Sequence, residues 1–438
     1  MLSRIFSEYV IVLVLLALAA FFSVATWTEQ AQRGAAGGGA LAQDIARQSP
    51  PGRFLVAVRD VPEDAAFAEA LEKTLTQQGW IAAASVRGHP ADAKTTLDRL
   101  NQAGDKLDAI ACTPETAAWL VFDGIAQKHP RLGAPRLFMP RSYSWPTFLT
   151  LGNLLNIAHQ IGILAILAIG MTLVIIAGGI DLSVGSLMAL AAVIAAWLIR
   201  EHGGADQASV GAMVVACACA IAVCALVGFG VGLTITWSDM PPFIVTLGVM
   251  MIARGSAFVL ADSQSIYQVP ETIDWLGRGA DLGIPNVAVL MLVLYIAAHV
   301  LMTRTVLGRY VYAVGGNREA ARLAGVPVSR VIWFVYVLSA TLAGLGGIVQ
   351  ASVLRSGSPT YGMDYELYSI AAVVIGGTSL RGGEGGVIGT FLGVLLIAIS
   401  QNGMNMIGVS SHWQRIVFGA VMLAAVLADS LKRRRGTG

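Results

Sequence analysis

The sequence predicts a mainly α-helical, polytopic membrane protein of about ten transmembrane helices with a broken-helix core, plus a small extracytoplasmic α/β domain with a parallel sheet. Of its 438 residues, 55% are hydrophobic and only 13% are charged, whereas soluble domains carry roughly 25% charged residues. Apolar runs near the ~20 residues that cross a bilayer recur along the chain. Between the first two runs, the pattern changes to short strands alternating with helices. The net charge of +2 is too small to indicate a nucleic-acid partner.

Each apolar run gives one expected span, and the run at 366–377 is shorter than the others. A helix can end within the membrane only where protein surrounds its end, because lipid cannot hydrogen-bond to open backbone. The expected spans are 9–27, 153–177, 184–199, 210–236, 242–261, 285–303, 330–353, 366–377, 386–401 and 412–430.

The distribution of Lys and Arg sets the expected orientation of these spans. The loop 304–330 holds five arginines and one acid, and the tail 432–438 begins with four basic residues. Both should be cytoplasmic, whereas the acidic segments 262–284 and 354–366 should lie outside. With ten spans, this places both termini in the cytoplasm and residues 28–146 outside, in the periplasm.

The amino-terminal part divides into a first transmembrane helix (1–28) and a flexible tether (29–52). The apolar stretch Tyr9–Trp27 is longer than the core of a secretory signal and lacks a small-residue cleavage site after it. We therefore expect an uncleaved anchor, with a cleaved signal as the alternative. Ala31–Ala40 is rich in Gly and Ala, which is typical of a flexible linker.

Residues 53–141 are expected to form a soluble α/β lobe. Apolar runs predict strands at 54–58, 81–86, 107–111 and 136–139, with helical periodicity between them. Thr113 is placed to cap a helix that starts with Pro114. This alternation predicts a small parallel sheet covered by helices on both faces.

The first informative motif joins two apolar spans with no hydrophilic loop between them. Gly178 and Gly179 let the backbone bend, and Asp181 is placed to cap a helix beginning near Leu182. The motif predicts a broken-helix element that lines the transport path; the alternative for Asp181 is a structural cap near the cytoplasmic surface. The predicted translocation core comprises Gly178, Gly179, Asp181, Ser183 and Gly185.

The second motif lies in the basic loop 304–330. A short amphipathic helix is expected at Glu319–Leu323, ended by Gly325 and Pro327, and such a helix suits docking into a groove on a cytoplasmic partner. The alternative is an ordinary positive loop. The predicted coupling residues are Gly315, Gly316, Asn317, Glu319, Ala320, Ala321 and Gly325.

The third motif is the Gly-rich turn around Arg381 and Glu384. No GxxxxGK[ST] sequence is present and no strand precedes the turn, so we expect helix packing rather than phosphate binding. The six histidines are scattered, without HExxH or other metal-ligand spacing, and no GxSxG nucleophile motif occurs. No catalytic residue, metal or cofactor is therefore expected, and the chain is predicted not to be an enzyme.

At these three motifs the sequence resembles the permease subunits of ribose/xylose-type ABC sugar importers. The matching stretches are Gly178–Leu190, Gly315–Val326 and 376–414, and the resemblance covers nearly all of a transmembrane domain at 145–431. It implies a bacterial inner-membrane permease that imports a monosaccharide or related small polar solute.

The resemblance also implies partners. They are cytoplasmic ATP-binding subunits that hydrolyse ATP, a periplasmic sugar-binding protein, and a second permease subunit, identical or different, all within membrane lipid. Asn317–Gly325 matches the family's ATPase-facing segment. We expect the loaded binding protein to dock on the acidic outer loops, including Asp364 and Glu366.

The insert Phe54–Met139 resembles the amino-terminal lobe of a ribose-type periplasmic binding protein, on the residues Leu107–Ala117. Only one lobe is present, and Asp60–Asp64 followed by a lone Phe67 stands where such lobes often carry an aromatic pair. The open alternatives are a docking or regulatory appendage, a structural relic, or a ligand-binding domain.

Two other functions compete with the ABC importer. An ion-coupled secondary sugar transporter would use an intramembrane ionisable residue, for which Asp181 is the main candidate. A membrane-anchored extracytoplasmic sensor would need a cytoplasmic signalling domain, and only the short basic tail follows residue 431.

Overall fold

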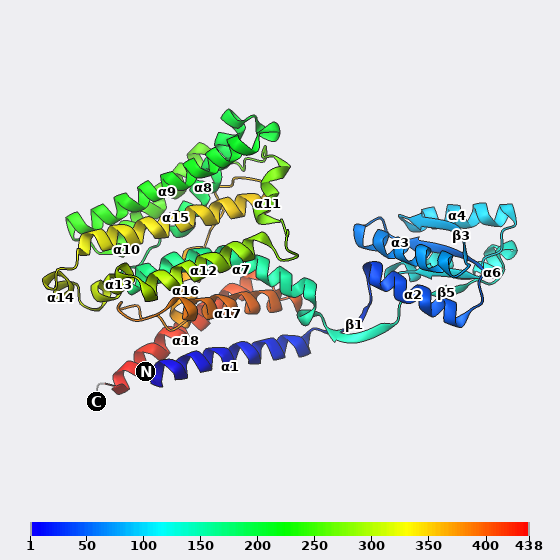
Figure 1. Cartoon of the computed structure of the whole chain (residues 1–438), viewed down its shortest axis with the longest axis horizontal. Helices are drawn as coiled ribbons and strands as arrows, with labels where there is room; N and C mark the ends of the chain where they lie inside the picture. Colours follow the sequence, from blue (N-terminus) through cyan, green and yellow to red (C-terminus); the bar gives the residue numbers. More distant parts are fainter. Residues whose placement is uncertain (1, 437–438) are drawn as a thin grey trace. The chain divides into compact units, whose positions relative to one another are not determined.

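The computed structural model describes residues 2–436 and divides the chain into two compact units (Figure 1). Unit 1 contains the residues up to Thr26 and those from Phe148 onward, and unit 2 contains Trp27–Thr147. Unit 1 is helical, whereas unit 2 combines strands and helices.

Unit 1 has a helix at every expected span. Among the described residues, seven helices are long and apolar enough to cross a membrane, which confirms a polytopic membrane protein. The apolar parts of α1 and α16 are shorter than these seven. The helices are α1 (Leu2–Ala25), α7 (Leu151–Ile176), α8 (Val184–Leu198), α9 (Val210–Ser238), α10 (Pro242–Leu260), α11 (Asp274–Gly277), α12 (Asn286–Arg304), α13 (Val306–Gly316), α14 (Arg318–Leu323), α15 (Val328–Leu354), α16 (Tyr365–Ile375), α17 (Val387–Met406) and α18 (Ser411–Gly436).

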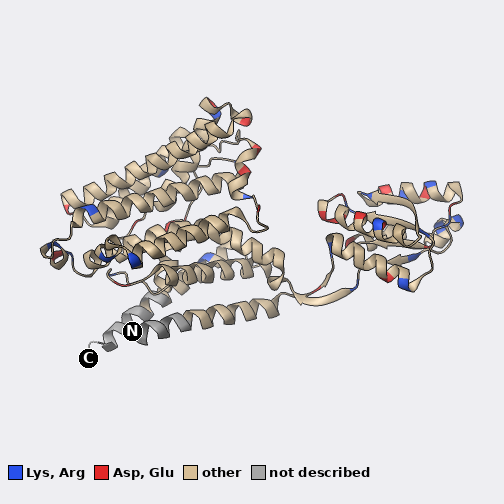
Figure 2. Ribbon diagram, in the orientation of Figure 1, with Lys and Arg blue, Asp and Glu red and all other residues tan. Residues whose placement is uncertain are grey.

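The centre of unit 1 is built around α7, α8 and α15. The most apolar windows of these helices are 89%, 72% and 67% buried, whereas those of α9, α10 and α12 are at most 28% buried. The outer helices therefore present most of their surface to lipid or to another chain. Figure 2 shows that charged residues of unit 1 lie mostly at the ends of the helices and in the loops between them.

Glycines allow the central helices to touch backbone to backbone. A Cβ built on Gly170 of α7 would lie 2.8 Å from Ser339 Cα of α15, and one on Gly347 of α15 would lie 2.2 Å from the Met188 carbonyl of α8. Small residues at such crossings favour close helix association in a membrane, where no hydrophobic force draws helices together. The abundance of glycine thus has a packing role.

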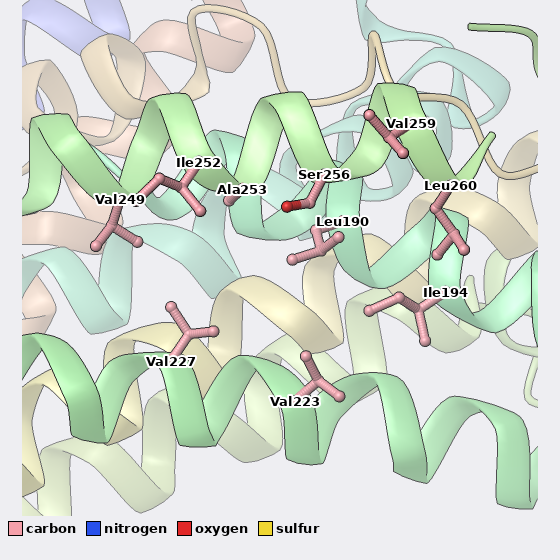
Figure 3. A pocket seen from close by; sticks show the side chains of 10 residues that line it. All are labelled: Leu190, Ile194, Val223, Val227, Val249, Ile252, Ala253, Ser256, Val259 and Leu260. Atoms are coloured by element: carbon pink, nitrogen blue, oxygen red, sulfur yellow. The ribbon is translucent and has the colours of Figure 1, made fainter. Parts of the chain in front are cut away.

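An apolar groove of about 650 Å³ lies between α10 and α9, with α8 also lining it (Figure 3). Its lining is aliphatic apart from Ser256, and Leu190, Val223 and Val249 represent the three helices around it. The groove lies beside α10, whose most apolar window is only 17% buried, the lowest share among the seven spans.

Unit 2 holds a four-stranded sheet with the order β3-β2-β4-β5. All three strand pairs are parallel, because each strand is followed by a helix that returns the chain to the same edge. Apolar side chains are buried on both faces, with Phe54 and Val56 on one and Leu55 and Ala57 on the other. The elements are β1 (Trp27–Ala31), α2 (Gly34–Gln48), β2 (Arg53–Val58), α3 (Pro62–Gln77), β3 (Ile81–Arg87), α4 (Pro90–Ala103), β4 (Ala109–Cys112), α5 (Pro114–Ala117), α6 (Ile125–Lys128), β5 (Arg136–Phe138) and β6 (Ser142–Pro146).

The predicted flexible tether at 29–52 is wrong. These residues contain β1, which pairs antiparallel with β6, and α2. Leu41 and Ile45 of α2 are buried in the same apolar cluster as Phe67. A Cβ on Gly38 would lie 2.1 Å from the Phe67 carbonyl, so α2 touches α3 through its glycines. The glycines serve close packing here, and the compact unit therefore extends beyond the expected 53–141 lobe to 27–147.

Candidate translocation core and coupling segment

The broken-helix element lies within the membrane-spanning part of unit 1. Residues 177–183 link α7 to α8, and Asp181 contacts Ser339 of α15. Ser339 lies roughly 17 Å along α15 from Val328 at 1.5 Å per residue, and the whole helix has 27 residues. Asp181 is therefore near the middle of the bilayer, whose apolar core is about 30 Å thick.

The Asp181 carboxylate connects the segment 177–183 to α15 through a hydrogen bond. Its Oδ1 accepts hydrogen bonds from Ser183 N at 3.0 Å and Ser183 Oγ at 2.6 Å, and its Oδ2 accepts one from Ser339 Oγ at 2.9 Å. Only 1% of Asp181 is exposed, so these bonds replace water as its partners. The predicted capping role is wrong, because α8 begins at Val184 with Ser183 as its N-cap.

Four glycines, Gly178, Gly315, Gly382 and Gly383, form a contact that we call the glycine junction. Gly383 N donates to the Ile176 carbonyl at 2.8 Å, and a Cβ on Gly315 would lie 1.7 Å from that same oxygen. Gly178, Gly382 and Gly383 have φ of +84°, +85° and +73°, a region that favours glycine. The junction thus joins the end of α7, the end of α13 and the Gly-rich turn after α16, which are the three segments singled out by sequence.

The other members of the predicted core lie apart from the glycine junction. A Cβ on Gly179 would lie 2.4 Å from Tyr336 Oη, so Gly179 packs against α15. Gly185, in the first turn of α8, faces the Gly362 carbonyl and Glu366 Oε2, at 2.2 and 2.3 Å from a built Cβ. The residues of the predicted core are therefore neighbours along the chain, but they do not form a single contact: the first lies in the glycine junction and the last packs against the start of α16.

The short helix predicted at Glu319–Leu323 is present as α14. Asn317 is its N-cap, with Oδ1 accepting from Ala320 N at 2.9 Å, and Gly325 follows it with a φ of +82°. Glu319 and Ala320 are exposed, and Glu319 pairs with Arg322 at 3.0 Å.

Two side chains of α14 refine that prediction. Leu323 is 81% exposed, so this apolar side chain is open to a partner. Ala321 is only 5% exposed, so it packs inside unit 1 and is unavailable to a partner. Every other residue of α14 is exposed: Arg318, Glu319, Ala320, Arg322 and Leu323. Gly315 and Gly316, at the end of α13, connect it to the glycine junction.

The two acids predicted to receive a binding protein have different environments. Asp364 is the N-cap residue of α16, with a φ of +69°, and its Oδ2 lies 3.3 Å from Arg415 Nη2. Glu366 is half-buried and faces Gly185. The structure therefore directs Glu366 into the helix bundle, and leaves Asp364 nearer its surface.

Sequence reasoning missed Arg254. This arginine belongs to the apolar run that forms α10, and its Nη1 donates to the carbonyls of Pro359 at 2.7 Å and Tyr361 at 2.6 Å. A charged residue inside an otherwise apolar span is the signal that identifies such a site. Its partners were not predictable, because they lie more than 100 residues away.

A second charged group missed from the sequence fixes the segment 262–285 to the end of α15. Arg355 forms ion pairs with Asp274 and, at 2.8 Å, with Glu271. Its hydrogen bonds to Asp274 and then to Glu271 raise the pKa of Arg355 above its ordinary value. Gly277 N also donates to Ser352 Oγ at 2.7 Å, so the segment is held by both charge and backbone contacts.

Comparison with known proteins identifies the family to which this chain belongs. Residues 153–426 match the family described as branched-chain amino acid transport system / permease component. The chain belongs to this permease family. It is a transport component rather than an enzyme.

Several curated relatives are sugar permeases. The permease is 43% identical to the ribose import permease protein RbsC of Bacillus subtilis, over 71% of this chain and 95% of the relative. It is 41% identical to RbsC of Escherichia coli K12 over 66% of this chain and 88% of the relative. It is 34% identical to the D-allose transport system permease protein AlsC of the same strain, over 65% and 85%. No solved structure is significantly similar to the permease.

The family match contains the Asp181 link, α14 and the glycine junction, because all of them lie within 153–426. Unit 2 at 27–147 lies outside it. The permease therefore carries an addition to the part that defines its family.

Proposed function

We propose that the permease is the membrane subunit of an ATP-binding-cassette importer that carries a monosaccharide or related small polar solute into the cell. Its 43% identity to a ribose import permease, over 95% of that relative, carries this proposal. The similarity to an allose permease supports a sugar substrate rather than an amino acid, whatever the description of the family.

Separate cytoplasmic ATP-binding subunits drive transport by pushing on α14. The exposed Leu323 and Ala320 give these subunits an apolar contact, and Glu319 gives a charged one. Gly315, at the end of the preceding helix, touches the Ile176 carbonyl directly. A displacement of α14 therefore reaches the end of α7 and the Asp181 link without a flexible intermediate, as rigid-body switching requires.

The permease spans the bacterial inner membrane about ten times, with both termini in the cytoplasm. The arginines of 304–330 and the basic tail support this orientation. A periplasmic sugar-binding protein delivers solute from outside the membrane, and a second permease subunit covers part of the exposed outer helices. The low burial of α9, α10 and α12 in a single chain is consistent with such a partner.

Unit 2 is a periplasmic docking or regulatory appendage. The chain leaves and re-enters unit 1 at one point, because Phe148 N donates to Thr26 Oγ1 at 3.1 Å. An insertion at such a point leaves the permease bundle intact.

Charges at one edge of the unit 2 sheet favour docking over capture of a small ligand. Arg59, just after β2, pairs with Asp64 at 2.9 Å, and Arg33 pairs with Glu115 at 3.0 Å. Arg59 and Asp64 follow the carboxyl end of β2, and Glu115 follows that of β4, where the strand order reverses and α/β folds usually bind ligands. Here these charged groups form ion pairs with one another instead of with a solute.

Uptake in cells tests the proposed substrate. A strain lacking this permease should lose uptake of radiolabelled ribose or allose, and a plasmid copy should restore it. Replacing 27–147 by a short Gly/Ser linker between Thr26 and Phe148 should leave the permease in the membrane. Unchanged uptake of both sugars in the deletion strain would contradict the proposal.

A further inference from the structure

Two short helices begin near the middle of the membrane and face each other. Gly185, in the first turn of α8, contacts Gly362, just before α16; a Cβ on Gly362 would lie 2.3 Å from the Gly185 carbonyl. The 11 residues of α16 span roughly 16 Å, about half of the ~30 Å apolar core. The amino-terminal ends of both helices, which carry partial positive charge, therefore meet inside the bilayer.

The chain between α15 and α16 reaches this meeting point in a non-helical conformation. Gly357 lies against the Ala192 carbonyl, at 2.5 Å from a built Cβ, and Gly362 lies against Gly185 farther along α8. Open backbone at this depth needs protein partners. Arg254 of α10 provides them for the carbonyls of Pro359 and Tyr361, at 2.7 and 2.6 Å.

Arg254 Nη1 binds the Tyr361 carbonyl at 2.6 Å, and Glu366, five residues farther along the same segment, faces Gly185 through its Oε2. No ion pair joins Arg254 to Glu366 among the described residues. Glu366 Oε2 is buried without a hydrogen-bond partner. Ser186, in the same turn as Gly185, is 1% exposed and its Oγ also lacks a partner. Unpaired polar groups are costly inside a membrane protein, so they are typical of a functional site.

We propose that Arg254 and Glu366 form a recognition point for the transported solute, and that they bind hydroxyl groups of a neutral polyol between them. This proposal rests on the proposed function, because it places the substrate of the importer at the junction of α8 and α16. A hydroxyl group donates to Glu366 Oε2 and accepts a hydrogen bond from the Arg254 guanidinium. One acid and one base at the site leave no net charge, which suits an uncharged sugar better than an ion.

Uptake and ATP hydrolysis, measured together, test the proposal. The full complex with its ATP-binding subunits and binding protein is reconstituted in vesicles, and uptake of radiolabelled ribose and allose is followed. Glu366→Gln and Arg254→Lys should each lower uptake at a low sugar concentration by about tenfold, because each weakens a hydrogen bond to a charged group. ATP hydrolysis stimulated by the binding protein should remain within about twofold of the wild type. The matched control is Asp206→Asn, the same acid-to-amide change at an exposed position.

Each other outcome overturns the assignment. Normal uptake in both variants shows that the pair does not contact solute. A proportional loss of uptake and ATP hydrolysis, or failure of both variants to assemble while Asp206→Asn does, shows a structural role. Absence of ribose and allose uptake by the wild-type complex refutes the proposed function itself, and the recognition point with it.

Discussion

Gly315→Ala tests the glycine junction most sharply. The new methyl group would lie 1.7 Å from the Ile176 carbonyl oxygen and 2.7 Å from Gly383 N. Both are backbone atoms, so relief requires moving α7 or the turn after α16 rather than rotating a side chain. Overpacking of this kind costs about 1–3 kcal/mol, and the strained Gly383–Ile176 hydrogen bond contributes up to about 1.5 kcal/mol more. We expect a loss of about 2–4 kcal/mol in stability.

Thermal unfolding of the purified permease in detergent measures this loss. The neighbouring Gly316→Ala is the matched control, since a Cβ there meets nothing within 4 Å. Gly315→Ala should lower Tm by several degrees, whereas Gly316→Ala should change stability by less than about 0.5 kcal/mol. Equal Tm values for the two variants would show that the glycine junction is not tightly packed, and would remove the proposed mechanical connection from α14 to α7.

Three further changes test other parts of the structure. Asp181→Ala should destabilise the permease by at least about 2 kcal/mol in thermal unfolding, because it leaves buried donors without an acceptor. Asp181→Asn keeps one acceptor oxygen and should cost less. Equal effects of the two changes would contradict the hydrogen bonds from Ser183 and Ser339 to Asp181. Leu323→Glu should lower binding-protein-stimulated ATP hydrolysis about tenfold without changing Tm, and full stimulation would exclude α14 as the coupling helix. Burial raises the pKa of the Cys112 thiol to about 12, so alkylation at pH 8 should be very slow and should accelerate as pH rises toward that value, because only the thiolate reacts. Leu41→Ala in α2 costs about 2–5 kcal/mol and should speed this alkylation, detected by mass spectrometry, whereas Gln43→Ala on the exposed face should not; equal rates would mean that α2 is not part of the core of unit 2.

Local patterns in the sequence are sufficient to predict most elements of this fold. Apolar length located the helices of unit 1, since a bilayer imposes that length directly. Asn317, Gly325 and the small residues between them located α14, because capping and termination depend on neighbouring residues.

Contacts distant in the sequence were not predictable in this way. Asp181 looked like a helix cap because nothing in the sequence indicates that Ser339 lies beside it. The glycines of 34–39 looked like a linker because the same composition suits flexibility and close packing; the buried Leu41 and Ile45 decide between them. Arg254 was visible as a charge in an apolar run, but its role depends on Pro359 and Glu366 in another segment.

The energy source of transport tests the central claim most directly. The permease is reconstituted in vesicles with its ATP-binding subunits and binding protein, and ribose uptake is measured with internal or external ATP and with imposed proton or sodium gradients. The account predicts that uptake requires ATP on the side of α14, and that Leu323→Glu lowers it about tenfold, as it lowers ATP hydrolysis. Uptake driven by an ion gradient without ATP or ATP-binding subunits, and lost on replacement of Asp181, would instead make the permease a secondary transporter and contradict the account.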